Sequence, residues 1–236
     1  RSTLFPYTTL FRSERWVSIL DSGNLAAGLM TVGQAFPKFR EDCRQLVAAM
    51  DWGAFYDKNR KLLLGGFNTL KGEFNPNWHL PLLGADSRLA SFLAIASGKV
   101  PPESWDALDR GMEQRHHVRY LVPGWQGGGL FMQYINGLWL DDRHTLMGQS
   151  AENFAYAQMM HAAANNYPVW GWSASDSPSG EYIGWGKLRD DVVTPHASAL
   201  AIQQFPQEVV ANLRALEILG ARSSVQIGRA SCRERV

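Results

Sequence analysis

The spacing of apolar residues along the chain predicts a protein built mainly of helices. In most of the sequence, apolar side chains recur every three or four residues, which is the period of one helix face. The segments between these stretches are rich in Trp and in Gly and Pro, which end helices. The helices expected on this basis cover residues 21–36, 37–50, 86–97, 129–140, 150–165, 195–204 and 206–219.

Strand-like patterns are few and short. Residues 52–72 alternate short apolar pieces with glycines, which predicts a small hairpin or an extended loop. Within the long loop 166–193, short strands are expected at 169–172 and 181–185. Because these strands lie in loops and the helices follow one another in pairs, the pattern favours an all-α helical barrel or toroid over an α/β domain.

Both ends of the chain resemble translated sequencing adapter. Residues 1–13 and about 226–236 read from opposite strands of one common oligonucleotide. We therefore expect a partial domain over residues 14–225 with a non-native segment on each side. Without these segments the chain has 18 basic and 21 acidic residues instead of 23 and 22. This small net charge gives no reason to expect nucleic acid as a partner, and no apolar run reaches the roughly 18 residues of an integral membrane span.

The sequence contains no pattern for a metal site, a nucleotide or a serine nucleophile. Cys43 is the one cysteine outside the terminal segments, and its position on an apolar helical stripe predicts a buried side chain. No His, Cys and Asp residues have the spacing of metal ligands, and the Gly-x-Ser-x-Gly pattern is absent. The glycines 127–129 lack the Lys and the preceding strand of a phosphate-binding loop. We expect neither a metal nor a cofactor.

Aromatic and acidic residues gather in the predicted loops, and the nine tryptophans are many for 236 residues. Flat aromatic rings stack on the C–H faces of sugars, while carboxylates, amides, Arg and His bind hydroxyl groups. Cleavage of a glycoside also needs two carboxyl groups across the bond. Each acidic candidate is weighed against a structural role: Asp86 could cap a helix, Asp176 could belong to a turn, and Glu181 has no local capping role.

Several motifs in a fixed order resemble the glucoamylase-like domain family. They are the segments 18–27, 86–96 and 100–105, the glycines 127–129, the Trp-Gly-Trp stretch that begins at Val169 and runs through Tyr182, and the Val-Thr-Pro-His-Ala-Ser segment 193–198. The likeness covers about residues 16–221. The chain is similar to bacterial endo-β-1,2-glucanases and to the C-terminal domain of cyclic β-1,2-glucan synthases.

The resemblance implies an (α/α)6 barrel, incomplete in this chain, with a substrate cleft built by loops at one end. It implies a glycoside hydrolase or transglycosylase that acts on a glucan-type oligo- or polysaccharide. A periplasmic or extracellular location is also implied, because family members are commonly exported. Together with the loop residues, it points to a carboxyl pair of Glu181 and Asp86, with Asp176 in reserve. The expected substrate-binding residues are Arg88, Trp125, Gln126, Gln133, Trp170, Trp172, Tyr182 and His196.

One position departs from the family pattern. Many relatives have Phe-Glu shortly after the glycines, whereas this chain has Phe131, Met132 and Gln133 there. Methionine cannot transfer a proton, and glutamine only donates or accepts hydrogen bonds. The chain is thus either an enzyme whose acid is one of the three carboxyl candidates, or a non-catalytic glycan-binding domain of the same fold. A third interpretation is a helical scaffold whose tryptophans belong to the core.

Overall fold

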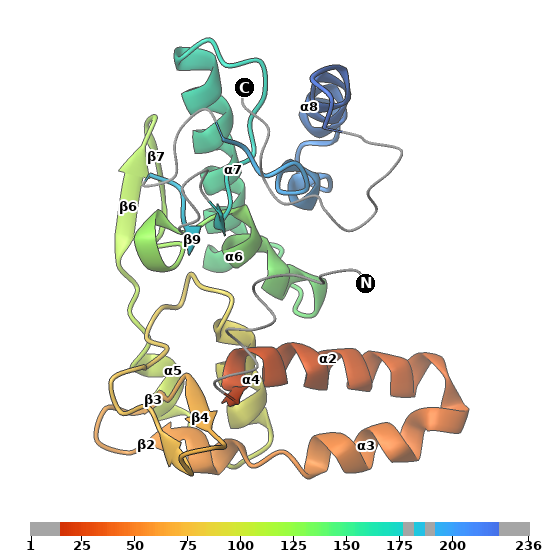
Figure 1. Cartoon of the computed structure of the whole chain (residues 1–236), viewed down its shortest axis with the longest axis vertical. Helices are drawn as coiled ribbons and strands as arrows, with labels where there is room; N and C mark the ends of the chain where they lie inside the picture. The colour runs from red at the N-terminus through yellow and green to blue at the C-terminus, as the bar shows by residue number, and fades with distance from the viewer. Residues whose placement is uncertain (1–14, 177–181, 187–191, 222–236) are drawn as a thin grey trace, which may run out of the picture. The chain divides into compact units, whose positions relative to one another are not determined.

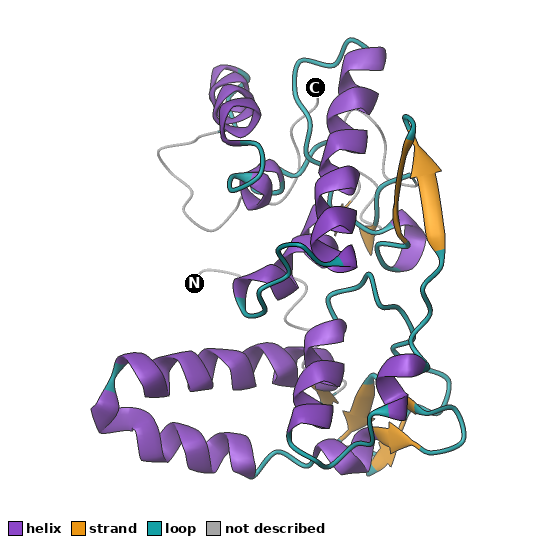
Figure 2. Cartoon of the chain, turned by 180° about the vertical axis from the view of Figure 1, so that it is seen from behind, coloured by secondary structure: helices purple, strands orange, loops and turns teal. Residues whose placement is uncertain are grey.

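The computed structural model describes residues 15–176, 182–186 and 192–221. The chain forms two compact units (Figure 1). The first unit comprises Arg1–Pro81 and Ser87–Asp109, and the second comprises Leu82–Asp86 and Arg110–Val236. Helices dominate both units and the strands are short (Figure 2), which confirms the helix-rich character predicted from the apolar spacing. The expected domain bounds at residues 14 and 225 stay a prediction.

A pair of consecutive helices forms much of the first unit (Figure 1). α2 covers Ile19–Ala35 and begins two residues before the predicted start. Ser18 is its N-cap, because the Ser18 hydroxyl accepts a hydrogen bond from the backbone N–H of Asp21 at 3.3 Å. α3 covers Arg40–Ala48 and follows a 3₁₀ turn that opens at Pro37. The remaining helical segments of this unit are η2 (Trp52–Phe55), α4 (Arg88–Ala96) and α5 (Glu103–Asp106).

The strands of the first unit confirm the hairpin expected within residues 52–72. They form two antiparallel sheets, one of β2 (Tyr56–Asp57) and β3 (Leu62–Leu63), and one in the order β1 (Trp16–Ser18), β4 (Gly66–Asn68) and β5 (Glu73–Phe74). The indole of Trp78 lies so close to the backbone of Gly65 and Gly66 that a Cβ at either position would overlap it. Packing against this ring is therefore the reason for the two glycines.

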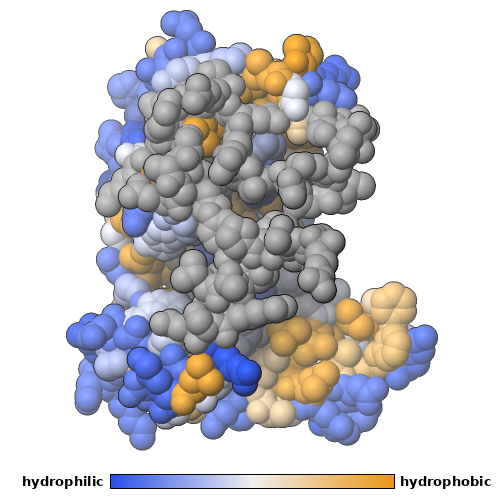
Figure 3. All heavy atoms as spheres, in the orientation of Figure 1, coloured by the Kyte–Doolittle hydropathy of each residue, from blue (hydrophilic) through white to orange (hydrophobic). Residues whose placement is uncertain are grey.

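The first unit also presents an exposed apolar surface. Apolar side chains gather over α2 and α3 (Figure 3), and Leu25, Phe36 and Leu46 are each more than half exposed. A groove of about 620 Å³ lies beside these helices and is lined by apolar residues such as Leu29 and Leu93. Cys43 lines this groove too and is buried, which confirms its expected place on the apolar stripe.

The second unit is organised around α7, which covers Leu146–Ala164. The hydroxyl of Thr145 accepts a hydrogen bond from the N–H of Gly148 at 3.2 Å, so this helix begins four residues before the predicted start. Its buried positions are mostly alanine, together with Phe154, so neighbouring elements approach the helix closely. The other elements are β6 (Met112–Arg115), β7 (Val118–Leu121), α6 (Leu130–Tyr134), β8 (Ser175–Asp176), β9 (Tyr182–Ile183) and α8 (Pro206–Ile218).

Three elements of the second unit differ from the sequence predictions. The helix expected over 129–140 is α6 followed by the 3₁₀ helix η4 (Ile135–Leu138). The helix expected over 195–204 is reduced to the 3₁₀ helix η5 (Ser198–Ala201). The β6–β7 hairpin was not expected, because each strand is only four residues long and gives too short an alternation to be recognised. Among the described residues, no helix is long and apolar enough to cross a membrane.

The prediction of a strand at 169–172 is also wrong. The N–H and carbonyl groups of Trp170 and Trp172 nevertheless make hydrogen bonds, with side chains in place of a neighbouring strand. Asn212 of α8 accepts a hydrogen bond from the N–H of Trp170 at 2.9 Å and donates one to its carbonyl at 2.8 Å. Gln158 of α7 does the same for Trp172, at 2.8 and 2.9 Å. All four residues are buried. Two side-chain amides therefore satisfy the backbone groups that a neighbouring strand would otherwise bond.

This arrangement predicts that Gln158→Leu destabilises the protein strongly. The leucine keeps the volume but leaves the N–H and the carbonyl of Trp172 without the amide in the core, which costs about 2–4 kcal/mol. Chemical denaturation measures the free energy of unfolding. The control is Gln207→Leu, an exposed position on α8, which should change stability by less than about 0.5 kcal/mol. Equal stabilities of the two variants would contradict the role of the amide.

Candidate functional site

The loop before α6 has a backbone shape that requires glycine. It includes the 3₁₀ helix η3 (Trp125–Gly127). Gly127 and Gly128 have φ angles of +85° and +63°. A Cβ on Gly127 would overlap the carbonyl oxygen of Trp185, and a Cβ on Gly128 would overlap that of Pro123. The N–H of Trp185 donates a hydrogen bond to the carbonyl of Gly128 at 2.8 Å. The glycine loop is thereby fixed to the segment 182–186.

This packing brings two exposed aromatic rings together. The rings of Trp125 and Tyr182 have centroids 5.5 Å apart and planes inclined by 41°. They are 43% and 56% exposed, so solvent reaches a large part of each side chain. Tyr182 lies in β9, where its backbone is paired with Asp176 of β8. The structure therefore gathers three of the predicted site residues at one place.

Trp170 and Trp172 belong instead to the core of the second unit. Trp172 is fully buried, and its ring stacks on that of Trp185 at a centroid distance of 6.3 Å. The guanidinium of Arg115 lies 4.4 Å from the centroid of the Trp185 ring. Because neither Trp170 nor Trp172 offers an exposed ring face, the four aromatic residues expected to bind sugar divide into an exposed pair and a buried pair. The scaffold interpretation accounts for the buried pair but not for Trp125.

Met132 and Gln133, which stand where the resemblance predicts a glutamate, are both buried. Met132 is 5% exposed and lies against Gly124. Gln133 is 4% exposed, and its amide N–H donates a hydrogen bond to the carbonyl of Leu121 at 3.0 Å. Its carbonyl oxygen accepts a hydrogen bond from the hydroxyl of Ser150 at 3.3 Å. Both ends of this amide are thus bonded inside the protein, and Gln133 ties α6 to β7 and α7.

Asp86 lies in the same unit as the aromatic pair. The segment that carries it is held by Asn136, whose side-chain N–H donates a hydrogen bond to the carbonyl of Ala85 at 3.0 Å. Asp86 is partly buried, and the N-cap position of α4 is occupied by Ser87, not by Asp86. Arg88 belongs to the first unit and is buried, with 2% exposed.

The other predicted residues are placed as follows. Gln126 is exposed next to Trp125, with a φ of +52°. His196 is exposed overall. Its ring is nevertheless partly surrounded by protein, and this loss of water lowers the pKa of the imidazole and favours the neutral form. Glu181 lies outside the described residues. Among the described residues, no three His, Cys, Asp or Glu side chains are grouped in a way that could hold a metal ion.

Comparison with known proteins places these residues in a family. The model of the Glycoamylase family, described as "Putative glucoamylase", matches residues 83–231. The chain belongs to the Glycoamylase family. This segment contains the glycine loop, the aromatic pair and the acidic candidates, so the site lies within the matched region.

Relatives of this Glycoamylase-family chain include one curated protein and several solved structures. It is 26% identical over 198 residues to the cyclic beta-(1,2)-glucan synthase NdvB of Rhizobium meliloti (strain 1021), which covers 77% of the chain and 7% of that protein. A structure with the family's description from Bacteroides uniformis ATCC 8492 matches with a TM-score of 0.75 and 17% identity, over 93% of this chain and 59% of the other. The endo-beta-1,2-glucanase from Chitinophaga pinensis, in complex with sophorotriose and glucose, matches with a TM-score of 0.66 and 18% identity, over 85% and 55%.

The chain thus spans a small part of the curated relative and little more than half of these solved chains. The sequence identities to the solved structures are low, so these similarities establish the fold. The helix-rich architecture and its relationship to glucan-processing proteins were both expected from the motif order, and both are confirmed.

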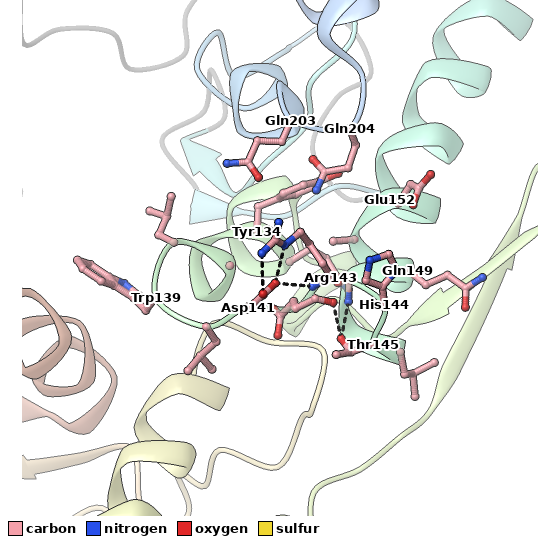
Figure 4. Close-up of a pocket in the computed structure, with 18 residues that line it drawn as sticks. Tyr134, Trp139, Asp141, Arg143, His144, Thr145, Gln149, Glu152, Gln203 and Gln204 are labelled. Carbon is pink, nitrogen blue, oxygen red and sulfur yellow. Dashed lines mark hydrogen bonds and ion pairs between the residues drawn. The ribbon is translucent and has the colours of Figure 1, made fainter. Parts of the chain in front are cut away.

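A second feature, which the sequence did not predict, is a hollow of about 1060 Å³ (Figure 4). It is lined by the segment from Gln133 to Glu152 and by Gln203 and Gln204, all in the second unit. At its rim, the guanidinium of Arg143 donates two hydrogen bonds to the carboxylate of Asp141, at 2.8 and 2.7 Å. These bonds lower the pKa of Asp141 to about 2. No local motif joins residues that lie some 50 positions apart, so the sequence carries no signal for this hollow.

The glycine loop predicts a sharp difference between two alanine substitutions. Gly127→Ala should destabilise the protein by at least about 2 kcal/mol, because it combines a positive φ with an overlap against the Trp185 carbonyl. Gly137→Ala, on η4, is the control: a Cβ there has no neighbour within 4 Å, so stability should stay equal or rise by up to about 1 kcal/mol. Thermal unfolding followed by tryptophan fluorescence measures both, and equal effects would contradict the packing described for Gly127.

Proposed function

We propose that the second unit binds a glucan chain at Trp125 and Tyr182, and that the protein acts on this chain as a glycoside hydrolase or transglycosylase. The observation that carries the proposal is the pair of exposed rings on a backbone fixed by the glycine loop. Rings that are already in place lose little freedom when a sugar stacks on them. The similarity to a cyclic beta-(1,2)-glucan synthase and to an endo-beta-1,2-glucanase structure supports a β-1,2-linked glucan as the substrate.

For the chemistry, we propose the carboxyl pair of Asp86 and Glu181, with Asp176 as the further candidate. One carboxyl group must stay protonated as the acid while the other is ionised. Asp86 shares a unit with the aromatic pair, and the backbone of Asp176 is paired with that of Tyr182, which supports a carboxylate beside the bound sugar. We favour inversion of configuration, which requires the two carboxyl groups to be about 6.5–9.5 Å apart.

We further propose that the helices of this chain are part of an (α/α)6 barrel. The consecutive helices α2 and α3, and the TM-scores of 0.71 and 0.75 to two Bacteroides structures, support this architecture. The location outside the cytoplasm that the resemblance implies remains a prediction.

A non-catalytic glycan-binding domain is the second candidate function. Met132 favours it, because the residue at the family's acidic position has no proton to transfer and is buried. Gln133 beside it is bonded to Leu121 and Ser150 and is not available to orient water. Both candidates use the same aromatic pair, so they differ in product formation and not in binding.

Removal of the aromatic rings tests the binding platform. We expect Trp125→Ala and Tyr182→Ala each to weaken the binding of sophorotriose by about tenfold or more, since the loss of one stacked ring removes on the order of 1.4 kcal/mol. Tyr182→Phe keeps the ring and should retain affinity within about threefold. Isothermal titration calorimetry measures the dissociation constants.

The control for these variants is Tyr156→Ala, which removes an exposed tyrosine from α7 outside the pair. It should leave the dissociation constant unchanged. Wild-type affinity in both Trp125→Ala and Tyr182→Ala would contradict the platform.

Product formation separates the enzyme from the binding domain. With a linear β-1,2-glucan as substrate, an enzyme releases shorter oligosaccharides or new transfer products, which chromatography detects. We then expect Glu181→Gln and Asp86→Asn each to lower the rate at least about 100-fold while the affinity for sophorotriose changes little, because each amide loses its proton-transfer function. A Glu181→Gln variant with the wild-type rate would refute that assignment, and binding without any product would favour the second candidate.

A further inference from the structure

The hollow at the C-terminal end of α6 has features of a ligand site separate from the aromatic pair. Its wall comes from η4 and the loop that follows, from the first turns of α7, and from Gln203 and Gln204 after η5 (Figure 4). Neither Trp125 nor Tyr182 lines it. Its volume of about 1060 Å³ is at the upper end of the range of about 300–1,000 Å³ for small-molecule sites.

Two hydrogen-bond donors among the lining residues have no partner. Tyr134 is 8% exposed, and its hydroxyl makes no hydrogen bond. The indole N–H of Trp139 is buried and makes none either. Leaving such a group unpaired costs about 1–3 kcal/mol, so protein interiors pair nearly all of them. Figure 4 places Tyr134 beside the glutamines of the hollow and Trp139 apart from them, so the Tyr134 hydroxyl is the donor whose cost an acceptor in the hollow would remove.

The hydroxyl of Tyr134 keeps its proton at all physiological pH values. Burial raises the pKa of Tyr134 above its ordinary value, and the negative charge of Glu152 raises it further. The group is therefore a donor to a neutral or partly negative oxygen. Figure 4 shows Gln203 and Gln204 close to the ring of Tyr134. Both are exposed and have long, flexible side chains, so they can turn to let a ligand reach the hydroxyl and can then bond the ligand through their own amides.

The charges around the hollow disfavour an anion. Asp141 and Arg143 neutralise each other through their paired hydrogen bonds. Glu152 is a further acidic residue of the lining. The other polar groups are mainly neutral amides, which both donate and accept hydrogen bonds. Amides and a tyrosine hydroxyl together match a neutral ligand with many hydroxyl groups.

We propose that this hollow is a second saccharide site, which binds a neutral oligosaccharide independently of Trp125 and Tyr182. The choice of a glucan as ligand rests on the proposed function, whereas the hollow and its unpaired donors do not. In an enzyme that acts on a polymer, a second site holds a distant part of the same chain and raises its local concentration at the aromatic pair.

Hydrogen exchange measured by mass spectrometry tests this proposal with sophorotriose as the probe. In the Trp125→Ala variant, we expect sophorotriose still to slow exchange in residues 138–149, which border the hollow. The additional substitution Tyr134→Phe should abolish this protection. Inorganic phosphate at the same concentration should give none. Absence of protection in residues 138–149 of the wild-type protein at saturating sophorotriose would overturn the proposal.

The matched variants separate a ligand role from a structural one. Because the Tyr134 hydroxyl has no partner, Tyr134→Phe should leave the melting temperature unchanged or raise it. The double variant Gln203→Ala with Gln204→Ala should weaken protection at the hollow at least threefold, whereas Gln207→Ala, outside the lining, should not. Protection that persists in both Tyr134→Phe and the double variant would overturn the proposal.

Hydrogen exchange in a different segment reports binding at the aromatic pair. Protection of residues 123–131 by sophorotriose reports the platform, and Trp125→Ala should remove it. Loss of that protection with retention at 138–149 supports two sites. Protection at 123–131 alone supports the proposed function and refutes the second site. Protection at 138–149 alone supports the second site and contradicts binding at the aromatic pair.

Discussion

The candidate site depends on the way side-chain amides bond one loop segment, residues 169–173. Asn212 and Gln158 bond the backbone of the two tryptophans there and so connect α8 and α7 to the segment. The N–H of Leu130, at the start of α6, donates a hydrogen bond to the carbonyl of Trp172 at 3.1 Å. Three helices of the second unit are therefore fixed to a single stretch of backbone. Since these groups are buried, each bond resists being broken by water.

Hydrogen bonds and ring stacking connect this segment to the aromatic pair. Where α6 starts, the glycine loop ends, and that loop is bonded in turn to Trp185, which stacks on Trp172. Trp125 and Tyr182 are attached at the surface of this arrangement. An exposed ring is usually free to change its rotamer, but the contact between the rings of Trp125 and Tyr182 restricts the rotamers that each can adopt. Rigidity beneath an exposed aromatic face is what a stacking site for a sugar requires.

The buried network also gives a structural role to Met132 and Gln133, which stand where the resemblance predicts a glutamate. Met132 fills space against the glycine loop, and Gln133 bonds the end of β7 and the hydroxyl of Ser150. Both side chains now contribute to packing and to hydrogen bonds within the protein. A carboxylate at position 132 would be buried, where its charged form is disfavoured. Any proton transfer in this chain therefore requires another carboxyl group, which is why Asp86, Asp176 and Glu181 carry the proposal.

Apolar spacing along the sequence was sufficient to predict most helices, because an amphipathic period of 3.6 is a local property. The motif order was sufficient to predict the family. The sequence could not distinguish Trp125, which is exposed, from Trp172, which is fully buried, because burial depends on which distant residues pack against a ring. It also predicted a strand at 169–172, but the backbone there is bonded by side-chain amides 14 and 42 positions away along the chain. The hollow beside Tyr134 was decided by tertiary structure alone, because its walls come from segments separated by about 50 residues.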